Sequence, residues 1–144
     1  MEKKYWKKLL NKKVQSNNNI NMEHKGKSIR PFIGAKNYAI SRQFYQDLGF
    51  QEIILAANMS YFKSDNLGFY LQDAYVKDWV DNTMIFMEVE DVKQFYSDLS
   101  ALDLPSKYNG VKLTSIREQD WGSECYLHDP SGILWHFGTF KPEK

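Results

Sequence analysis

Cysteine is almost absent from this chain, and long apolar runs are absent altogether. Cys125 is the single cysteine among 144 residues, which excludes an intrachain disulfide and a zinc site built from cysteines. No stretch of 18 apolar residues occurs, so we expect no membrane-spanning helix. The lysines near the start are followed by no apolar core of the kind that a secretory signal requires. A reducing cytoplasm is therefore the compartment that we expect.

Net charge is also small, at +1, but it is unevenly distributed. Residues 1–30 hold nine Lys and Arg against two Glu, a net charge of +7, whereas residues 31–144 hold ten against sixteen, a net charge of −6. We interpret residues 1–28 as a basic, flexible extension; a tether to an anionic surface or a nucleic acid is the alternative. Because an acidic body repels phosphate and attracts cations, we expect neither a nucleic acid nor a membrane as partner.

The remaining chain, residues 29–144, carries an internal repeat that predicts its architecture. QFYQDL at residues 43–48 returns as QFYSDL at residues 94–99, 51 positions later. An apolar stretch and a helix-capping residue, Asn37 or Asp91, precede each copy. The apolar spacing after each cap is helical. Each repeat therefore begins with a strand followed by a helix.

Three extended stretches follow each predicted helix. In the first half they cover residues 51–57, 59–63 and 67–73, and in the second half residues 111–118, 123–128 and 133–140. Asp129-Pro130-Ser131-Gly132 has the composition of a tight turn. The sequence thus predicts an α+β fold of two βαβββ modules in tandem: module one (29–73), a linker (74–81) and module two (82–140). The alternation along the strands predicts that one face of each sheet packs on its helix and the other is left open.

Three segments together resemble the vicinal oxygen chelate superfamily, which includes glyoxalases, bleomycin-resistance proteins and extradiol dioxygenases. They read FIGAKNYAISRQFYQDLGF, MIFMEVEDVKQFYSDL and CYLHDPSGILWHFG. The resemblance covers about residues 29–140 and implies the glyoxalase/bleomycin-resistance fold, in which the two modules form a curled mixed sheet with a cleft. It also implies a homodimer with two clefts.

In metal-dependent members of this superfamily, four cleft positions carry His, Glu or Gln. Carried onto this chain, those positions hold Arg30, Gln72, Met84 and His136. Arg offers no lone pair, and a Met thioether prefers soft ions to zinc, nickel, manganese or iron. We therefore predict no metal, no other cofactor and no catalytic residue, and a protein that binds without reacting.

Strand alternation instead places an aromatic pocket with a few polar groups in the cleft, which is the usual composition of a small-molecule site. The predicted ligand-binding residues are Arg30, Phe32, Tyr70, Gln72, Met84, Phe86, Glu88, Trp121 and His136. The predicted function is sequestration of a planar aromatic or cationic drug-like ligand, such as an antibiotic of the bleomycin type, which would confer antibiotic resistance.

Three alternatives remain at this point. The aromatic residues could simply fill the space between two sheets. The protein could be a metal-dependent lyase, isomerase or dioxygenase of the same superfamily. A two-residue hairpin would also place Cys125 directly opposite His136, which would create a Cys–His contact, although a small buried thiol is the commoner role.

Overall fold

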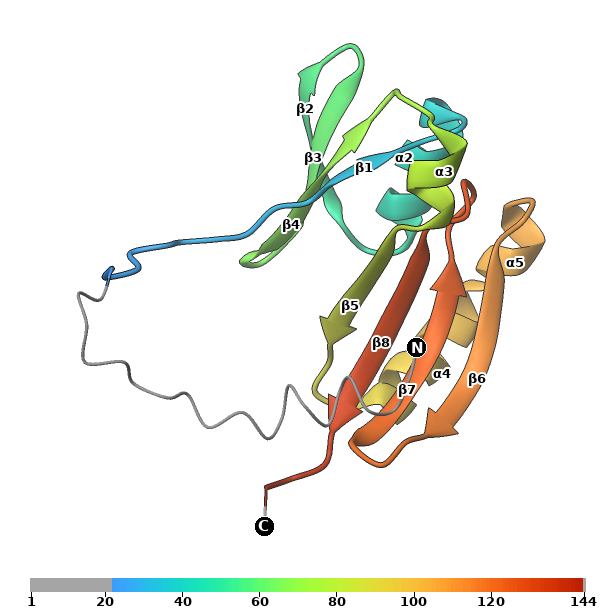
Figure 1. The fold of residues 1–144 in the computed structure, drawn as a ribbon. Helices are drawn as coiled ribbons and strands as arrows, with labels where there is room; N and C mark the ends of the chain where they lie inside the picture. The colour runs from blue at the N-terminus through green and yellow to red at the C-terminus, as the bar shows by residue number, and fades with distance from the viewer. Residues whose placement is uncertain (1–21, 144) are drawn as a thin grey trace.

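The structure is a computed structural model that describes residues 22–143. It consists of two βαβββ modules, each with its own four-stranded sheet (Figure 1). The predicted α+β fold class is therefore confirmed. The elements are β1 (Phe32–Gly34), α2 (Tyr38–Asp47), β2 (Gln51–Ala56), β3 (Met59–Ser64) and β4 (Leu67–Gln72) in module one, α3 (Lys77–Asp81) in the linker, and β5 (Met84–Glu88), α4 (Val92–Leu102), α5 (Leu104–Lys107), β6 (Lys112–Glu118), β7 (Gly122–His128) and β8 (Leu134–Phe140) in module two.

The two sheets have the same strand order, as the sequence repeat predicts. The first is ordered β1-β4-β3-β2 and the second β5-β8-β7-β6. The first strand of each module pairs in parallel with the last strand, and the other neighbours are antiparallel. This arrangement brings the first and last strands of a module together, so their side chains on the open face form one surface.

The two long helices begin where the sequence places their caps. The side chain of Asn37 accepts a hydrogen bond from the backbone N–H of Ile40, and the side chain of Asp91 accepts from Lys93 and Gln94. Each cap satisfies backbone donors that the first helical turn leaves without partners. Both helices predicted from the repeat are confirmed.

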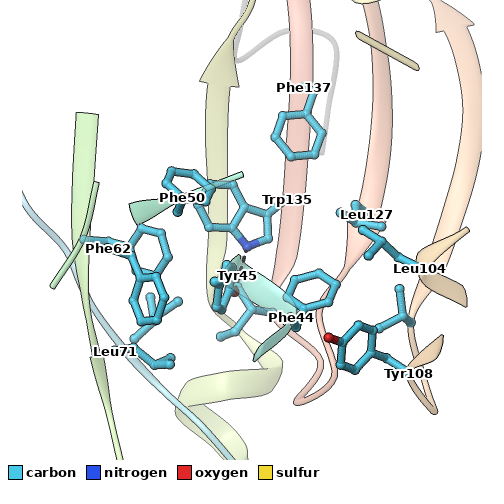
Figure 2. Packing of buried hydrophobic residues seen from close by; sticks show 14 of the residues in the cluster. Phe44, Tyr45, Phe50, Phe62, Leu71, Leu104, Tyr108, Leu127, Trp135 and Phe137 are labelled. Carbon is cyan, nitrogen blue, oxygen red and sulfur yellow. Dashed lines mark hydrogen bonds between the residues drawn. The ribbon is translucent and has the colours of Figure 1, made fainter. Parts of the chain in front are cut away.

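One hydrophobic core extends across both modules. Tyr45 of α2 is fully buried, and its ring contacts those of Phe69 in β4 and Trp135 in β8, at centroid distances of 4.8 and 5.9 Å; Figure 2 shows Tyr45 and Trp135 side by side. The Tyr45 hydroxyl accepts a hydrogen bond from Trp135 Nε1 (3.0 Å) and donates one to Asp129 (2.7 Å). These two hydrogen bonds connect α2 of module one to the β7–β8 hairpin of module two.

Three features differ from, or extend beyond, the sequence analysis. The short helices α3 and α5 were not predicted, and β1 is shorter than the apolar stretch that predicted it. Residues 22–31 form no helix or strand and are exposed. The rest of the predicted basic extension, residues 1–21, lies outside the described residues. Within residues 22–143, no helix is both long enough and apolar enough to cross a membrane.

Candidate functional site

The open face of the first sheet carries a small cluster of aromatic rings around one guanidinium group. Phe32 of β1 stacks on Tyr70 of β4, with ring centroids 4.6 Å apart, and 59% of Phe32 is exposed. Arg30 donates a hydrogen bond to the Tyr70 hydroxyl (3.1 Å), and its guanidinium carbon lies 4.3 Å from the ring centroid of Tyr61 in β3. We call Arg30, Phe32, Tyr61 and Tyr70 the aromatic cluster. It offers a flat, exposed, apolar surface of the kind on which another ring can stack.

Gly68 of β4 makes this arrangement possible. A Cβ atom at this position would lie only 2.2 Å from the Tyr61 hydroxyl oxygen, so any larger residue would displace the Tyr61 ring. Gln72, at the end of β4, pairs with Gly34 and Met59 and is half-buried.

The open face of the second sheet forms the floor of a cavity of about 320 Å³. Strand pairing sets Tyr126 of β7 directly opposite His136 of β8, and His128 opposite Leu134. Because alternate residues share a face, Glu124 lies on this face as well. We call this space the sheet-two cavity; it is lined by Met84, Thr114, Arg117, Gln119, Trp121, Glu124, Tyr126, His128, Leu134 and His136.

A buried hydrogen-bond network lies in the wall of the sheet-two cavity. Nδ1 of His136 is 2.9 Å from a carboxylate oxygen of Glu124, and both side chains are almost fully buried. Burial, the hydrogen bond to Glu124 and the Glu124 charge together raise the pKa of Tyr126 to about 12. Tyr126 therefore stays a neutral phenol at physiological pH, and Glu124 has both a ring nitrogen and a hydroxyl as partners.

Phe86 and Trp121 pack behind this network. Their ring centroids are 5.7 Å apart, and Phe86 lies 6.4 Å from the His136 ring. Gly138 allows this close packing, because a Cβ atom there would lie 2.8 Å from Phe86 and 3.1 Å from Trp121. Trp121 is only 7% exposed and forms part of the cavity wall.

A second hollow, of about 630 Å³, lies between the two modules. It is mostly apolar and is lined by residues of β4, β5 and the segment before β1. Glu88 lines this groove and does not line the sheet-two cavity. The full lining is Ile29, Pro31, Phe50, Asn66, Leu67, Gly68, Phe69, Ile85, Phe86, Met87, Glu88 and Trp135.

The structure thus distributes the nine predicted site residues over three places. Arg30, Phe32 and Tyr70 form part of the aromatic cluster, with Gln72 further along the same strand; Met84, Trp121 and His136 line the sheet-two cavity, with Phe86 packed against it; and Glu88 lies in the groove between the modules. Neither the sheet-two cavity nor the groove between the modules is lined by both the aromatic cluster and the His136 network. The two sets of residues lie on separate sheets.

The anticipated contact between Cys125 and His136 is wrong. Cys125 pairs with Phe137, while Tyr126 occupies the position opposite His136. The reason is the length of the loop: the last paired residues are His128 and Leu134, which leaves five residues between them instead of an even number, and this shifts the register by one. Cys125 is fully buried in the core, and burial together with the Glu124 charge raises the pKa of its thiol to about 11. It is therefore a thiol, not a thiolate nucleophile, at neutral pH.

The donor atoms at the four positions implied by the resemblance do not fit a divalent metal. The guanidinium of Arg30 contacts two tyrosines and offers no lone pair, and Met84 offers only a thioether, so only Gln72 and His136 of the four could supply an oxygen or nitrogen donor. Across residues 22–143, no three His, Cys, Asp or Glu side chains gather in a way that could hold a metal ion. We derive no metal-dependent step for this site.

Several cavity residues were not anticipated from the sequence, chiefly Glu124, Tyr126 and Arg117. Alternation alone could have found Glu124 and Tyr126, because they flank the core residue Cys125 on β7. His128 is half-buried and lines the cavity, and its Nδ1 is covered without a hydrogen-bond partner. The strand register of β6 shifts at a bulge between Thr114 and Arg117, and no sequence pattern predicted this bulge.

Comparison with solved structures identifies the class of fold. A bleomycin-binding protein from bleomycin-producing Streptomyces verticillus, solved with copper(II)-bleomycin, is similar with a TM-score of 0.70 and 20% identity, over 83% of this chain and all of that one. A second bleomycin-binding protein, solved with bleomycin, gives a TM-score of 0.67 at 16% identity, over 79% of this chain and 98% of that one. This chain therefore has the glyoxalase/bleomycin-resistance fold, as the sequence resemblance implied.

The same fold also carries enzymes. Lactoylglutathione lyase from Agrobacterium tumefaciens is similar with a TM-score of 0.62 and 16% identity, over 81% of this chain and 96% of that one. The sequence matches no protein-family model and no curated protein. Because proteins of this fold include both binders and enzymes, function must be argued from the residues of the site.

Proposed function

We propose that this protein binds a planar aromatic or cationic small molecule, without a metal and without catalysing a reaction. The observation that carries the proposal is the pair of half-sites, in which an exposed aromatic cluster on one sheet and a lined cavity on the other occupy the faces that point away from the helices. Flat apolar surface next to a few fixed polar groups is what orients an aromatic ligand. The net charge of −6 over residues 31–144 adds an attraction for cations.

We also propose that a second copy of the chain completes the cleft. The aromatic cluster and the sheet-two cavity do not share a cavity within one chain, and both expose large apolar groups, including Phe32 (59%) and Met84 (52%). An exposed apolar patch is typical of a surface that a partner covers. A dimer in which sheet one of each chain faces sheet two of the other would supply two complete clefts.

Sedimentation of the purified full chain tests the dimer. We expect a species of twice the 17.0 kDa chain mass at micromolar concentration. Substituting Phe32 by Asp should shift that species toward the monomer, because it would place a charge at a surface that the partner covers. A monomer at all concentrations would reject the shared cleft, while binding to a single chain would still have to be tested as below.

Isothermal titration with bleomycin, chosen because two structural neighbours were solved with it, tests the binding function. We expect saturable heat with one drug molecule per chain. Phe32→Ala should weaken binding by about tenfold, because stacking on one ring contributes roughly 0.5–1.5 kcal/mol beyond area burial. Tyr75→Ala, an exposed aromatic residue of the linker, is the matched control and should leave the dissociation constant unchanged.

Absence of heat from a folded protein would reject bleomycin as the ligand, and unchanged binding in Phe32→Ala would reject the aromatic cluster as its surface. Metal analysis of the same sample distinguishes metal-independent binding from a metal-dependent enzyme. Stoichiometric nickel, zinc or manganese would overturn a metal-independent function and favour a metal-dependent lyase, isomerase or dioxygenase.

A further inference from the structure

One ring nitrogen in the wall of the sheet-two cavity has no partner. His136 is 4% exposed, and its Nδ1 is bound to Glu124, yet its Nε2 is fully covered and makes no hydrogen bond. Most buried polar atoms are paired, because an unsatisfied one costs roughly 1–3 kcal/mol. An unpaired buried nitrogen beside a cavity is therefore a candidate hydrogen-bonding group for a ligand.

The hydrogen bond to Glu124 determines what that nitrogen can do. A carboxylate oxygen can only accept, so the shared hydrogen lies on Nδ1 of His136. A neutral imidazole carries one ring hydrogen, and Nε2 is then left with a lone pair and no hydrogen. Glu124 also has Tyr126 as a second partner, so the carboxylate is held in place and fixes the orientation of the ring.

The side chains around Nε2 of His136 indicate which kind of ligand group can bind there. The side chains that line the cavity include one guanidinium, Arg117, and one carboxyl group, Glu124, so the lining has no excess of acidic or basic groups apart from its histidines. Trp121 supplies a flat wall, and the Tyr126 ring lies edge-on to His136 at a centroid distance of 4.8 Å. A neutral, flat ring fits such a space better than a charged group does.

We propose that the sheet-two cavity recognises a neutral aromatic heterocycle through an N–H group that donates a hydrogen bond to Nε2 of His136. The proposal rests on the proposed small-molecule binding function and names the chemical class of the ligand's buried end. Because Nε2 is covered in the structure, the ligand enters by displacing a neighbouring side chain. Met84 lines the same cavity, is half-exposed and has a flexible thioether chain, so it is the lining side chain that can move aside most easily.

A matched pair of probes, indole and 1-methylindole, tests the donor. The two rings have nearly the same shape, but methylation removes the N–H. We expect indole to bind about tenfold more tightly, the ratio that corresponds to satisfying one buried acceptor. In His136→Phe the two probes should bind equally, whereas Glu90→Gln, a carboxylate outside the cavity, should keep the tenfold ratio.

A measurement on the unsubstituted protein keeps the proposal testable should His136→Phe fail to fold. Long-range proton–nitrogen NMR spectra at neutral pH should show a hydrogen on Nδ1 of His136 and none on Nε2, and the Nε2 resonance should move when indole is added but not with 1-methylindole. A hydrogen on Nε2 in the protein without probe would overturn the proposal directly.

The remaining outcomes separate this proposal from the binding function on which it rests. If both probes bind equally well to the unsubstituted protein, the cavity binds aromatic rings, but the recognition by His136 is rejected. If the tenfold ratio survives in His136→Phe and disappears in His128→Phe, the acceptor is the other unpartnered imidazole and our assignment is wrong. If neither probe binds, recognition of a neutral heterocycle by the sheet-two cavity is rejected, while the binding function itself is decided by the titration with bleomycin.

Discussion

Replacing Asp129 by alanine is expected to lower the free energy of unfolding by about 3–5 kcal/mol, because several buried donors would lose their acceptor together. Asp129 is 1% exposed, and one of its oxygens accepts from the backbone N–H groups of Ser131, Gly132 and Ile133 at 2.8–2.9 Å. Its other oxygen accepts from the hydroxyl of Tyr45 in the other module. The substitution therefore disrupts both the β7–β8 turn and a connection between the modules.

Urea unfolding followed by circular dichroism measures this effect. Asp129→Asn keeps one side-chain oxygen as acceptor and should lose clearly less stability than Asp129→Ala. Asp98→Ala removes an exposed carboxylate that bonds only within α4, and should change the free energy of unfolding by less than about 0.5 kcal/mol. A loss below about 1 kcal/mol in Asp129→Ala would show that these donors find other partners and that the turn does not depend on the carboxylate.

Replacing Trp135 by alanine is expected to be equally severe, at about 3–5 kcal/mol, because it leaves a large void in the part of the core shared by both modules. The Trp135 ring lies 5.4 Å from Phe69 and 5.9 Å from Phe50 of module one, and 5.9 Å from Phe137 of its own strand. Figure 2 shows the Trp135 ring near Phe50 and Phe137. No other strand residue of module two has ring contacts with three aromatic residues of module one among those described.

The partial substitution Trp135→Phe separates packing from hydrogen bonding. It keeps a ring in the core but removes the indole N–H that Tyr45 accepts, so we expect a loss of about 1–2 kcal/mol. Circular dichroism at increasing urea is the appropriate measurement, because the substitution removes a fluorophore. If Trp135→Ala were as mild as Trp135→Phe, the core between the modules would have to close around the missing ring.

Much of the fold follows directly from local patterns in the sequence. The repeat at residues 43–48 and 94–99 predicts two modules of the same order, and the capping residues Asn37 and Asp91 predict where their helices begin. Alternation predicts which strand residues enter the core, and Ile33, Leu71, Trp135 and Phe137 are buried accordingly. These features depend on neighbours a few residues away, and such neighbours can be recognised in a single sequence.

The site is formed by contacts between residues far apart in the chain, and local sequence patterns do not specify such contacts. A loop of five residues instead of an even number placed Tyr126, not Cys125, opposite His136, and so replaced a Cys–His contact with a Glu–His–Tyr network. Residues of module one that were predicted to share a cleft with module two instead form their own cluster. Strand register and the relative placement of two sheets are set by the packing of the whole chain.

The sequence by itself determined the two-module α+β fold, the helix starts, the core faces of the strands and the poor fit of four key positions to a metal. Only the tertiary structure decided that Glu124 holds His136, that Nε2 of this histidine is buried without a partner, and that the aromatic cluster and the sheet-two cavity are separate in one chain. The physical reason is that periodicity specifies which face a side chain occupies, whereas partners across a sheet or between modules are selected by the packing of segments far apart in the chain.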